Sequence, residues 1–393
     1  MSGDSMCGIG ERIATARRAR RLTQRELADT AGLSHVMIRS IERGARRPSE
    51  ASLDAIASAL GVDPSRLLAT GLRATGRVHA AMPALSAAIA AYDLPDDGPV
   101  RTVGELREAV AAAEAWRLAA QYVRLAEAAP PLLMELTRAL HQVPAPTRPT
   151  MAALLVSACR SADAVAYKAG HHDLSARLID VMRWAVPLAE NPELAAVTAY
   201  VRTEVFFSSR AHEAGLRALE AAVEAAPAPF SFATAAARGA LHMRAAVVAG
   251  RAGLPVRAAE HLAEARTLAA KVPEAVYQGT AFGPDSVRIH ELSFAVGLGE
   301  PGTQRALAVG RDWSPPTYLP PERRSGFYIE FARAQLWAGR RAEAFASLAM
   351  ARRIAPQHTR EHLWARETAA TLLRLSRAAD SRLSAFAEWV GAV

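Results

Sequence analysis

Residues 32–49, with the sequence GLSHVMIRSIERGARRPS, place hydrogen-bond donors and cations beside a short apolar stripe. Ile38 and Ile41 are three residues apart, so on a helix they would share one face and need a core. The polar neighbours that this arrangement leaves outside the core are His35, Arg39 and Ser40. Imidazole, guanidinium and hydroxyl groups all donate hydrogen bonds, and Arg also neutralises anions, so this face suits a polyanionic surface.

The distribution of charge along the chain also favours a polyanion partner for its first residues. The net charge is +8, from 47 basic and 39 acidic residues. Residues 1–77 hold 13 Arg and 8 acidic residues, an excess of +5, whereas the remaining 316 residues have an excess of only +3. A compact basic domain indicates a polyanion partner, and a solvated basic surface is the alternative. All the basic residues except Lys168 and Lys271 are Arg, a bias typical of GC-rich genomes and consistent with an actinobacterial source.

Composition predicts an all-α protein of two or three domains. The 393 residues are 51% hydrophobic but only 6% aromatic, and Ala is frequent, which favours helices packed through small residues. Alternating β-branched runs and an Asn-Gly hairpin signal are absent from the sequence. No signal peptide or membrane span is expected, because the apolar run Ala80–Tyr92 is too short to cross a bilayer. Cys7 and Cys159 lack metal-ligand spacing, which favours a reducing cytoplasm.

Five short helical segments are predicted in residues 1–70. Their signals are an amphipathic run at 11–21, the capping box Thr23–Glu26, the N-cap Ser34 after Gly32, the start Pro48–Ser49 and the turn Asp63–Pro64. A Gly-containing turn between the second and third helices is the helix-turn-helix arrangement. The residues from Ile9 to Leu68 resemble the Cro/cI-type, or XRE, helix-turn-helix family through TQRELA (23–28), GLS (32–34), IRSIERG (38–44), PS (48–49) and LDAIASALGV (53–62). A helical bundle with arginines on its solvent face is the alternative.

The resemblance implies that the third helix enters the DNA major groove. The positions that would face base edges are His35, Val36, Arg39 and Ser40. Arg39 is the strongest candidate for sequence readout, because an arginine can donate two hydrogen bonds to guanine. The positions that would contact phosphates are Thr23, Gln24, Arg43, Arg46 and Arg47, and Arg17 and Glu42 match an internal ion pair. One short helix reads few base pairs, so a homodimer on a pseudo-palindromic double-stranded DNA operator is expected.

The rest of the chain is predicted to be a linker followed by helical repeats. Residues 71–102 form the expected linker, with a short helix at Pro83–Tyr92 and a loop at 94–100. Residues 103–393 resemble a tetratricopeptide-like solenoid. Its copies are recognised by Gly339 with Pro356, by Gly253 with Pro273, by Pro227, by Gly170 with Pro187, and by a degenerate unit at 285–312. A plain all-helical bundle is the alternative.

Such a layout resembles bacterial transcriptional regulators whose large domain senses an effector or dimerises. Many relatives bind short peptides through Asn side chains, but this chain has a single Asn, Asn191, so a small molecule or a protein partner is at least as well supported. The candidate groove residues are Tyr200, Phe206, His242, Arg244, His290 and Tyr328. A tetratricopeptide-like adaptor with an accessory DNA-binding domain is the alternative function.

Three further patterns could indicate catalysis or a metal. His358–His362 spells H-x-x-E-H, 297–302 spells G-x-G-x-x-G, and His171-His172-Asp173 follows a turn. The first lacks room for the third ligand well downstream that its class requires, the second lacks a preceding strand, and the third lacks partners. We therefore expect no enzyme activity, no metal and no cofactor.

Overall fold

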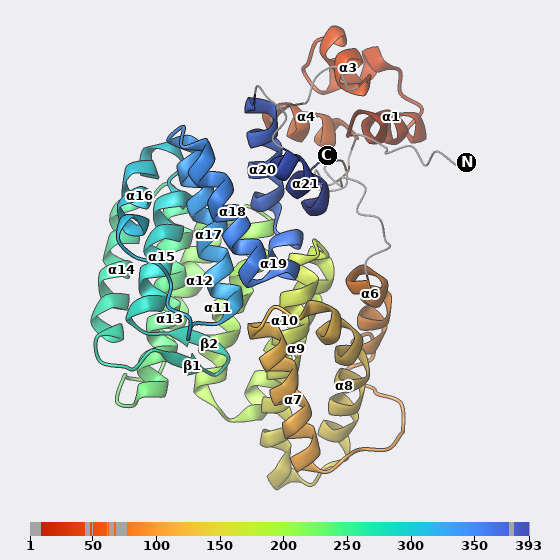
Figure 1. Ribbon diagram of the computed structural model, residues 1–393. Coiled ribbons are helices and arrows are strands. Elements are labelled where there is room, and N and C mark those ends of the chain that lie inside the picture. The colour runs from red at the N-terminus through yellow and green to blue at the C-terminus, as the bar shows by residue number, and fades with distance from the viewer. Residues whose placement is uncertain are drawn as a thin grey trace. The chain divides into compact units, whose positions relative to one another are not determined.

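The computed structural model describes residues 9–43, 48, 50–60, 62, 67, 77–376 and 381–392. Contacts divide the chain into two units, Met1–Gly76 and Arg77–Val393, and each is considered by itself. The described elements are helical apart from one two-stranded hairpin, so the prediction of an all-α protein is confirmed (Figure 1). Within these residues no helix is both long enough and apolar enough to cross a bilayer.

The first unit is a small bundle whose helices begin and end where local signals place them. Its described helices are α1 (Ile9–Ala19), α2 (Gln24–Thr30), α3 (His35–Glu42) and α4 (Glu50–Leu60). Thr23 and Glu26 form the predicted capping box, and Ser34 Oγ accepts from the amide of Met37. Gly32 takes a φ of +64° between α2 and α3. The expected fifth helix lies outside the described residues, except for the buried Leu67.

A fully buried aliphatic core holds this bundle together. Ile13, Leu27, Ile38, Ile41 and Ile56 are each 0% exposed and belong to one cluster. Tight packing of α1 on α3 depends on Gly10, since a Cβ there would lie 2.0 Å from the carbonyl oxygen of Ile41. The core thus fixes which side of α3 remains outward.

The second unit stacks antiparallel helix pairs. The pairs are α7 (Val103–Leu118) with α8 (Tyr122–Gln142), α9 (Arg148–Lys168) with α10 (His172–Ala185), α11 (Pro192–Ser208) with α12 (His212–Ala225), α13 (Phe232–Arg251) with α14 (Pro255–Ala269), α15 (Pro284–Gly297) with α16 (Thr303–Arg311), and α17 (Pro321–Trp337) with α18 (Arg341–Ile354). The first helices of successive pairs pack on one another, as in a tetratricopeptide-like solenoid.

Shorter elements complete the unit. They are α6 (Arg77–Ala88), η1 (Ala145–Thr147), η2 (Val186–Ala189), β1 (Ala275–Tyr277), β2 (Thr280–Phe282), η3 (Glu300–Gly302), α19 (Pro356–Glu361), α20 (Leu363–Leu375) and α21 (Ser381–Val390). The β1–β2 hairpin lies between the α7–α10 and α13–α16 parts of the unit (Figure 1). The sequence pattern does not predict this hairpin, because its turn is Gln-Gly and not Asn-Gly.

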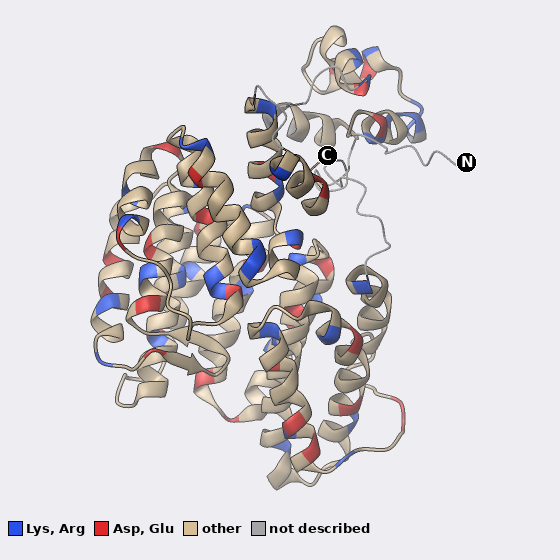
Figure 2. Cartoon of the chain, in the orientation of Figure 1, with Lys and Arg blue, Asp and Glu red and all other residues tan. Residues whose placement is uncertain are grey.

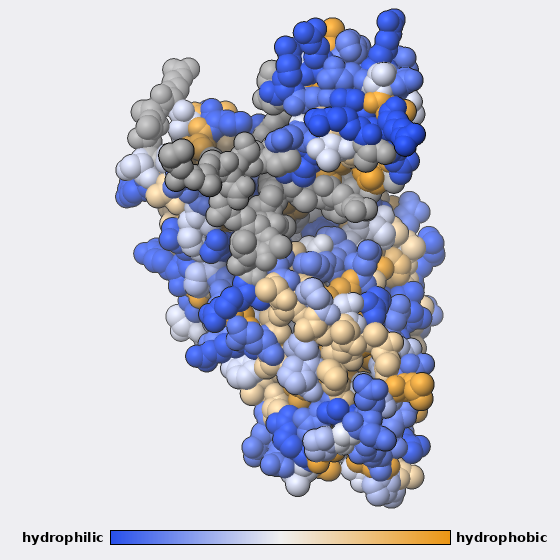
Figure 3. Space-filling view, turned by 90° about the vertical axis from the view of Figure 1, so that its right-hand side faces the viewer, coloured by the Kyte–Doolittle hydropathy of each residue, from blue (hydrophilic) through white to orange (hydrophobic). Residues whose placement is uncertain are grey.

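Helix α6 belongs to the second unit and packs against α8. The sequence predicts a helix at 83–92 within a linker of residues 71–102, whereas the observed helix spans Arg77–Ala88 and includes Pro83. Met82 and Leu85 are buried in the main core, which explains why this segment is held in place. The face of the molecule on the α6 side carries weakly hydrophobic residues among hydrophilic ones (Figure 3).

One residue with positive φ ends the first helix of every pair from α7 to α18. These residues are Ala120, Gly170, Arg210, Gly253, Gly299 and Gly339. A left-handed residue lets the chain reverse in a short turn, and glycine adopts that conformation without a Cβ penalty. The repeat turns therefore share a positive φ at this residue even where it carries a side chain, although Gly299 has a ψ of −149° and is not left-handed helical.

Gly253 offers a direct test of that geometry. Its φ is +74°, and a Cβ built there would meet no atom within 4 Å, so backbone strain is the only expected effect of a methyl group. We expect Gly253→Ala to lower the free energy of unfolding of the second unit by about 1 kcal/mol. Urea unfolding followed by circular dichroism measures this change.

Gly104 in α7 is the matched control. It is exposed, and a Cβ added there would touch only Thr102 Oγ1, at 3.9 Å. Gly104→Ala should therefore stabilise the unit by up to about 1 kcal/mol, because Ala is the better helix former. Shifts of the same sign in both variants would contradict the strained-turn explanation.

Candidate nucleic-acid interface and repeat-domain interior

Helix α3 separates a buried side from an outward side. Ile38 and Ile41 are fully buried, whereas His35 and Arg39 are exposed and Val36 is 72% exposed. Among the described residues, no hydrogen bond or ion pair involves the Arg39 guanidinium. This face therefore presents a cation and an apolar side chain that the first unit itself does not use.

The other three residues on this helix, Met37, Ser40 and Glu42, are only partly exposed. Ser40 is half-buried, and Met37 packs against the core, where its Sδ lies 3.9 Å from Ser52 Oγ. The predicted base-facing positions His35, Val36, Arg39 and Ser40 thus lie on one helix, with Ser40 nearest the core side.

Glu42 joins α3 to the first two helices. Arg17 Nε donates to Glu42 Oε1 at 2.7 Å, Arg17 Nη2 donates to Oε2 at 3.0 Å, and Gln24 Nε2 donates to Oε2 at 2.8 Å. Burial opposes ionisation of this carboxyl, but the hydrogen bonds from Arg17 and Gln24 outweigh it and hold the pKa of Glu42 below its ordinary value. Glu42 is thus ionised and buried with its partners.

This contact changes the expected role of Gln24. The resemblance places Gln24 at a phosphate, whereas its side-chain amide here donates to Glu42 inside the unit. Thr23 Oγ1 accepts from the amide of Glu26 at 3.2 Å and is likewise used in a cap. Arg43 is exposed at the end of α3, and the phosphate candidates Arg46 and Arg47 lie outside the described residues.

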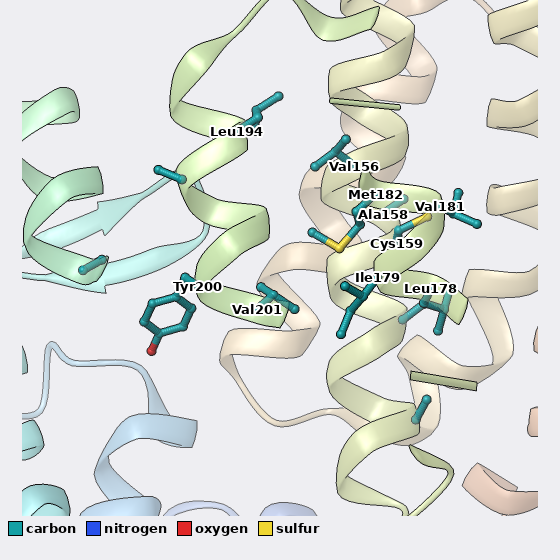
Figure 4. Close-up of a cluster of buried hydrophobic side chains, with 14 of the residues drawn as sticks. Val156, Ala158, Cys159, Leu178, Ile179, Val181, Met182, Leu194, Tyr200 and Val201 are labelled. Atoms are coloured by element: carbon teal, nitrogen blue, oxygen red, sulfur yellow. The ribbon is translucent and has the colours of Figure 1, made fainter. Parts of the chain in front are cut away.

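Charged residues also occur on the first helices of the second unit (Figure 2), and some of their side chains are buried. Tyr200 on α11 points away from the hydrophobic cluster of α9 and α10 (Figure 4), and its hydroxyl accepts from Arg323 Nη2 at 3.1 Å. The Arg244 guanidinium lies 4.5 Å from the centroid of the Tyr200 ring. Burial raises the pKa of this phenol, but Arg323, Arg244 and Arg160 more than offset that effect and lower it to about 8.

The six predicted groove residues do not form one site. Tyr200 and Arg244 are in contact, and the buried His290, whose Nδ1 donates to the Ser286 carbonyl at 2.9 Å, lies within the field of Arg323 and Arg244. The side chains of the other three lie elsewhere. Phe206 packs over Gly215, His242 contacts His261 with 3.0 Å between their Nδ1 atoms, and Tyr328 packs edge-on against Phe327.

Sequence reasoning missed the charges inside the second unit. The buried ones are Arg117, Arg160 and Asp163, and Lys168, Glu322 and Arg323 are partly exposed. Lys168 forms an ion pair with Glu322, which joins α9 to α17. A usable signal existed: Arg160 and Tyr200 each precede the turn residue of their repeat, Gly170 and Arg210, by the same ten positions. Equal offsets place side chains on the same face of successive first helices.

The patterns that could have indicated catalysis have structural roles here. His358 lies in α19 and contacts Ser325 Oγ at 2.6 Å, whereas His362 caps α20, so the H-x-x-E-H residues are not on one helix. Gly299 forms the turn between α15 and η3. In the described part of the chain, no cluster of three His, Cys, Asp or Glu side chains could hold a metal ion.

Comparison with known proteins identifies the first unit. Residues 13–67 match the helix-turn-helix family model. The immunity repressor protein of Bacillus phage phi105 is 42% identical over 60 residues, which are 15% of this chain and 42% of the repressor. The chain therefore spans less than half the length of the curated relative that it matches.

The solved structures that match the chain are more distant in sequence than this repressor. PlcR of Bacillus thuringiensis, in complex with the peptide PapR7 and DNA, gives a TM-score of 0.26 at 13% identity and covers 66% of this chain and 93% of its own. ComR of Streptococcus vestibularis gives 0.28 at 14% identity, covering 93% and 97%, and PrgX gives 0.27 at 9% identity, covering 96% and 98%.

The Glu42 contacts predict a pH-dependent stability of the first unit. Because the folded-state pKa of Glu42 is lowered, its contribution is complete above its ordinary pKa and disappears as pH falls through the folded-state pKa. Glu42→Gln should destabilise the unit by about 2–4 kcal/mol at neutral pH, since Arg17 is left without its carboxylate. Calorimetric unfolding between pH 7 and pH 3 should show this difference shrinking in acid. Asp29→Asn, at an exposed position of α2, serves as control, and a constant difference across pH would contradict the assignment.

Proposed function

Because the first unit is a helix-turn-helix domain, we propose that this protein is a sequence-specific DNA-binding transcriptional regulator. The observation that carries the proposal is the outward side of α3, where the exposed Arg39 and the 72% exposed Val36 lie opposite a fully buried aliphatic side. An α-helix of this size fits the major groove. A cytoplasmic location is part of the proposal, since operator DNA in a bacterial cell lies there.

Each residue of this face has a distinct proposed role. Arg39 donates to guanine O6 and N7, Val36 contacts a thymine methyl group, and His35 and Ser40 donate to a base or a neighbouring phosphate. Arg43, Arg46 and Arg47 neutralise phosphates and supply the salt-dependent part of the affinity. Thr23 and Gln24 act through the backbone at the start of α2, because their side chains are used within the unit.

The second unit is proposed to sense an effector and to hold two chains together. The interior residues Tyr200, Arg244 and His290 support an effector site, because they bring a buried phenol, a partly buried guanidinium and a buried neutral imidazole onto the inner helices. A homodimer follows from the length of α3, which contacts only a few base pairs, so that two copies would read a pseudo-palindromic operator.

The Arg39 assignment is tested with a base-substitution series. Arg39→Ala should weaken operator binding by about 1–3 kcal/mol and relax the preference at one base position. Arg39→Lys is the matched control, because it keeps the charge and loses the two-point hydrogen bond. Gel shifts and footprinting on the DNA upstream of the gene, at several salt concentrations, measure both effects. Equal binding of all sequences by the wild-type chain would favour the adaptor function instead.

A further inference from the structure

The β1–β2 hairpin inserts its turn among the inner helices of the second unit. Its strands pair in the register Ala275 with Phe282 and Tyr277 with Thr280. The end of the hairpin opposite the turn, its base, is held on α13. Its residue Phe282 is fully buried, and the Phe282 ring fills the space that a Cβ at Gly239 of α13 would occupy. The two residues of the turn, Gln278 and Gly279, have φ values of +46° and +72°.

The turn makes hydrogen bonds with two buried arginines on different helices. Arg117 Nη2 on α7 donates to the Gly279 carbonyl oxygen at 2.7 Å. Arg160 on α9 donates through Nη1 to the Gln278 carbonyl oxygen and through Nη2 to Thr280 Oγ1 at 2.6 Å. Both arginines are only 5% exposed. Three oxygens of the hairpin thus converge on two guanidinium groups.

None of these oxygens carries a charge. Glu114 Oε2 faces the same turn and accepts from Ser157 Oγ at 3.3 Å, but among the described residues no carboxylate forms an ion pair with Arg117 or Arg160. Arg117 Nε is buried without a hydrogen-bond partner in the same set. Burial first, and then the nearby Arg117 and Arg323, lower the pKa of Arg160 to about 9, against the opposing effects of Tyr200 and Glu114.

Buried cations normally have anionic partners, because an uncompensated buried charge strongly destabilises a fold. Carboxylates and phosphates bind arginines with shorter and stronger charge-assisted hydrogen bonds than neutral carbonyls do. The oxygens of the turn therefore accept hydrogen bonds from Arg117 and Arg160 without supplying negative charge, and Arg117 Nε still lacks a partner among the described residues.

We propose that Arg117 and Arg160 form a binding site for an oxyanion, the carboxylate or phosphate group of the effector, and that the Gln278–Gly279 turn occupies this site in the absence of ligand. The proposal rests on the effector-sensing function proposed above and names the chemistry of its ligand. Ligand and turn compete for the same donors, so binding displaces the turn while Phe282 keeps the hairpin base on α13.

Gly279 allows the competition to be altered without changing either arginine. A Cβ at this position would lie 2.8 Å from Arg117 Nη2 and 2.9 Å from Arg160 Nη1. Gly279→Ala should therefore push the turn off the arginines. Gly253→Ala is the matched control, because it introduces a methyl group at a similar φ where no atom lies within 4 Å.

The experiment is a calorimetric titration of the full-length chain at constant ionic strength. The probes are inorganic phosphate, tri-alanine with a free carboxylate, and tri-alanine amide. We expect Gly279→Ala to bind phosphate or tri-alanine roughly tenfold more tightly than the wild type and Gly253→Ala, because its internal competitor is weakened. The amide should not bind, and Arg117→Gln or Arg160→Gln in the Gly279→Ala background should remove binding. Preference between phosphate and tri-alanine distinguishes the two sources of the oxyanion.

Hydrogen exchange on the wild-type chain provides a second measurement that does not depend on the folding of the arginine variants. A saturating oxyanion probe should increase amide exchange in residues 276–281 and leave the control helix α13 unchanged. Unchanged exchange in this segment, oxyanion affinity that does not differ among Gly279→Ala, Gly253→Ala and wild type, or binding that survives both arginine substitutions would overturn the proposal.

Gel shifts on the same variants separate this proposal from the proposed function. If the chain does not bind the oxyanion probes but still binds the operator in an Arg39-dependent way, only the oxyanion site is overturned. If the chain binds the oxyanion probes but shows no sequence preference in DNA binding, the DNA-reading function is overturned and the oxyanion site stands.

Discussion

The second unit depends on one recurring backbone constraint, a residue with positive φ after each first helix from α7 to α17. This residue reverses the chain in a short turn, so each pair is antiparallel and its first helix lies against the first helix of the next pair. Side chains that precede the turn residue by the same number of positions then lie on the same face of successive first helices. The burial of Arg160, Tyr200 and their neighbours is a consequence of that repetition, and the alanine-rich helices make the close approach feasible.

Local signals made the first unit predictable. The capping box at Thr23, the positive φ of Gly32 and the cap at Ser34 each involve neighbours in sequence, so residue type and spacing indicate them directly. The outward and buried sides of α3 follow from the same spacing. The role of Gln24 could not be deduced in this way, because its contact with Glu42 depends on how three helices pack.

The second unit was predictable as a series of helix pairs but not as a site. The helix pairs α13–α14 and α17–α18 are predictable from their glycine turns. The hairpin is not, because its turn Gln278–Gly279 lacks the usual Asn or Asp before the glycine. Which arginines become buried is decided by contacts such as that between Arg117 and Gly279, residues far apart in the chain. Phe206, His242 and Tyr328 lie on first helices as the interior residues do, yet their side chains contact Gly215, His261 and Phe327 instead.

The hairpin also has a mechanical consequence. A solenoid bends and extends easily when each repeat contacts only its neighbours. Here the turn joins α7 and α9 to a strand pair seated on α13 and α15, and Lys168 with Glu322 joins α9 to α17. These contacts join repeats that are far apart in the chain and oppose bending of the unit, so a few side chains contribute to the stiffness of the whole unit.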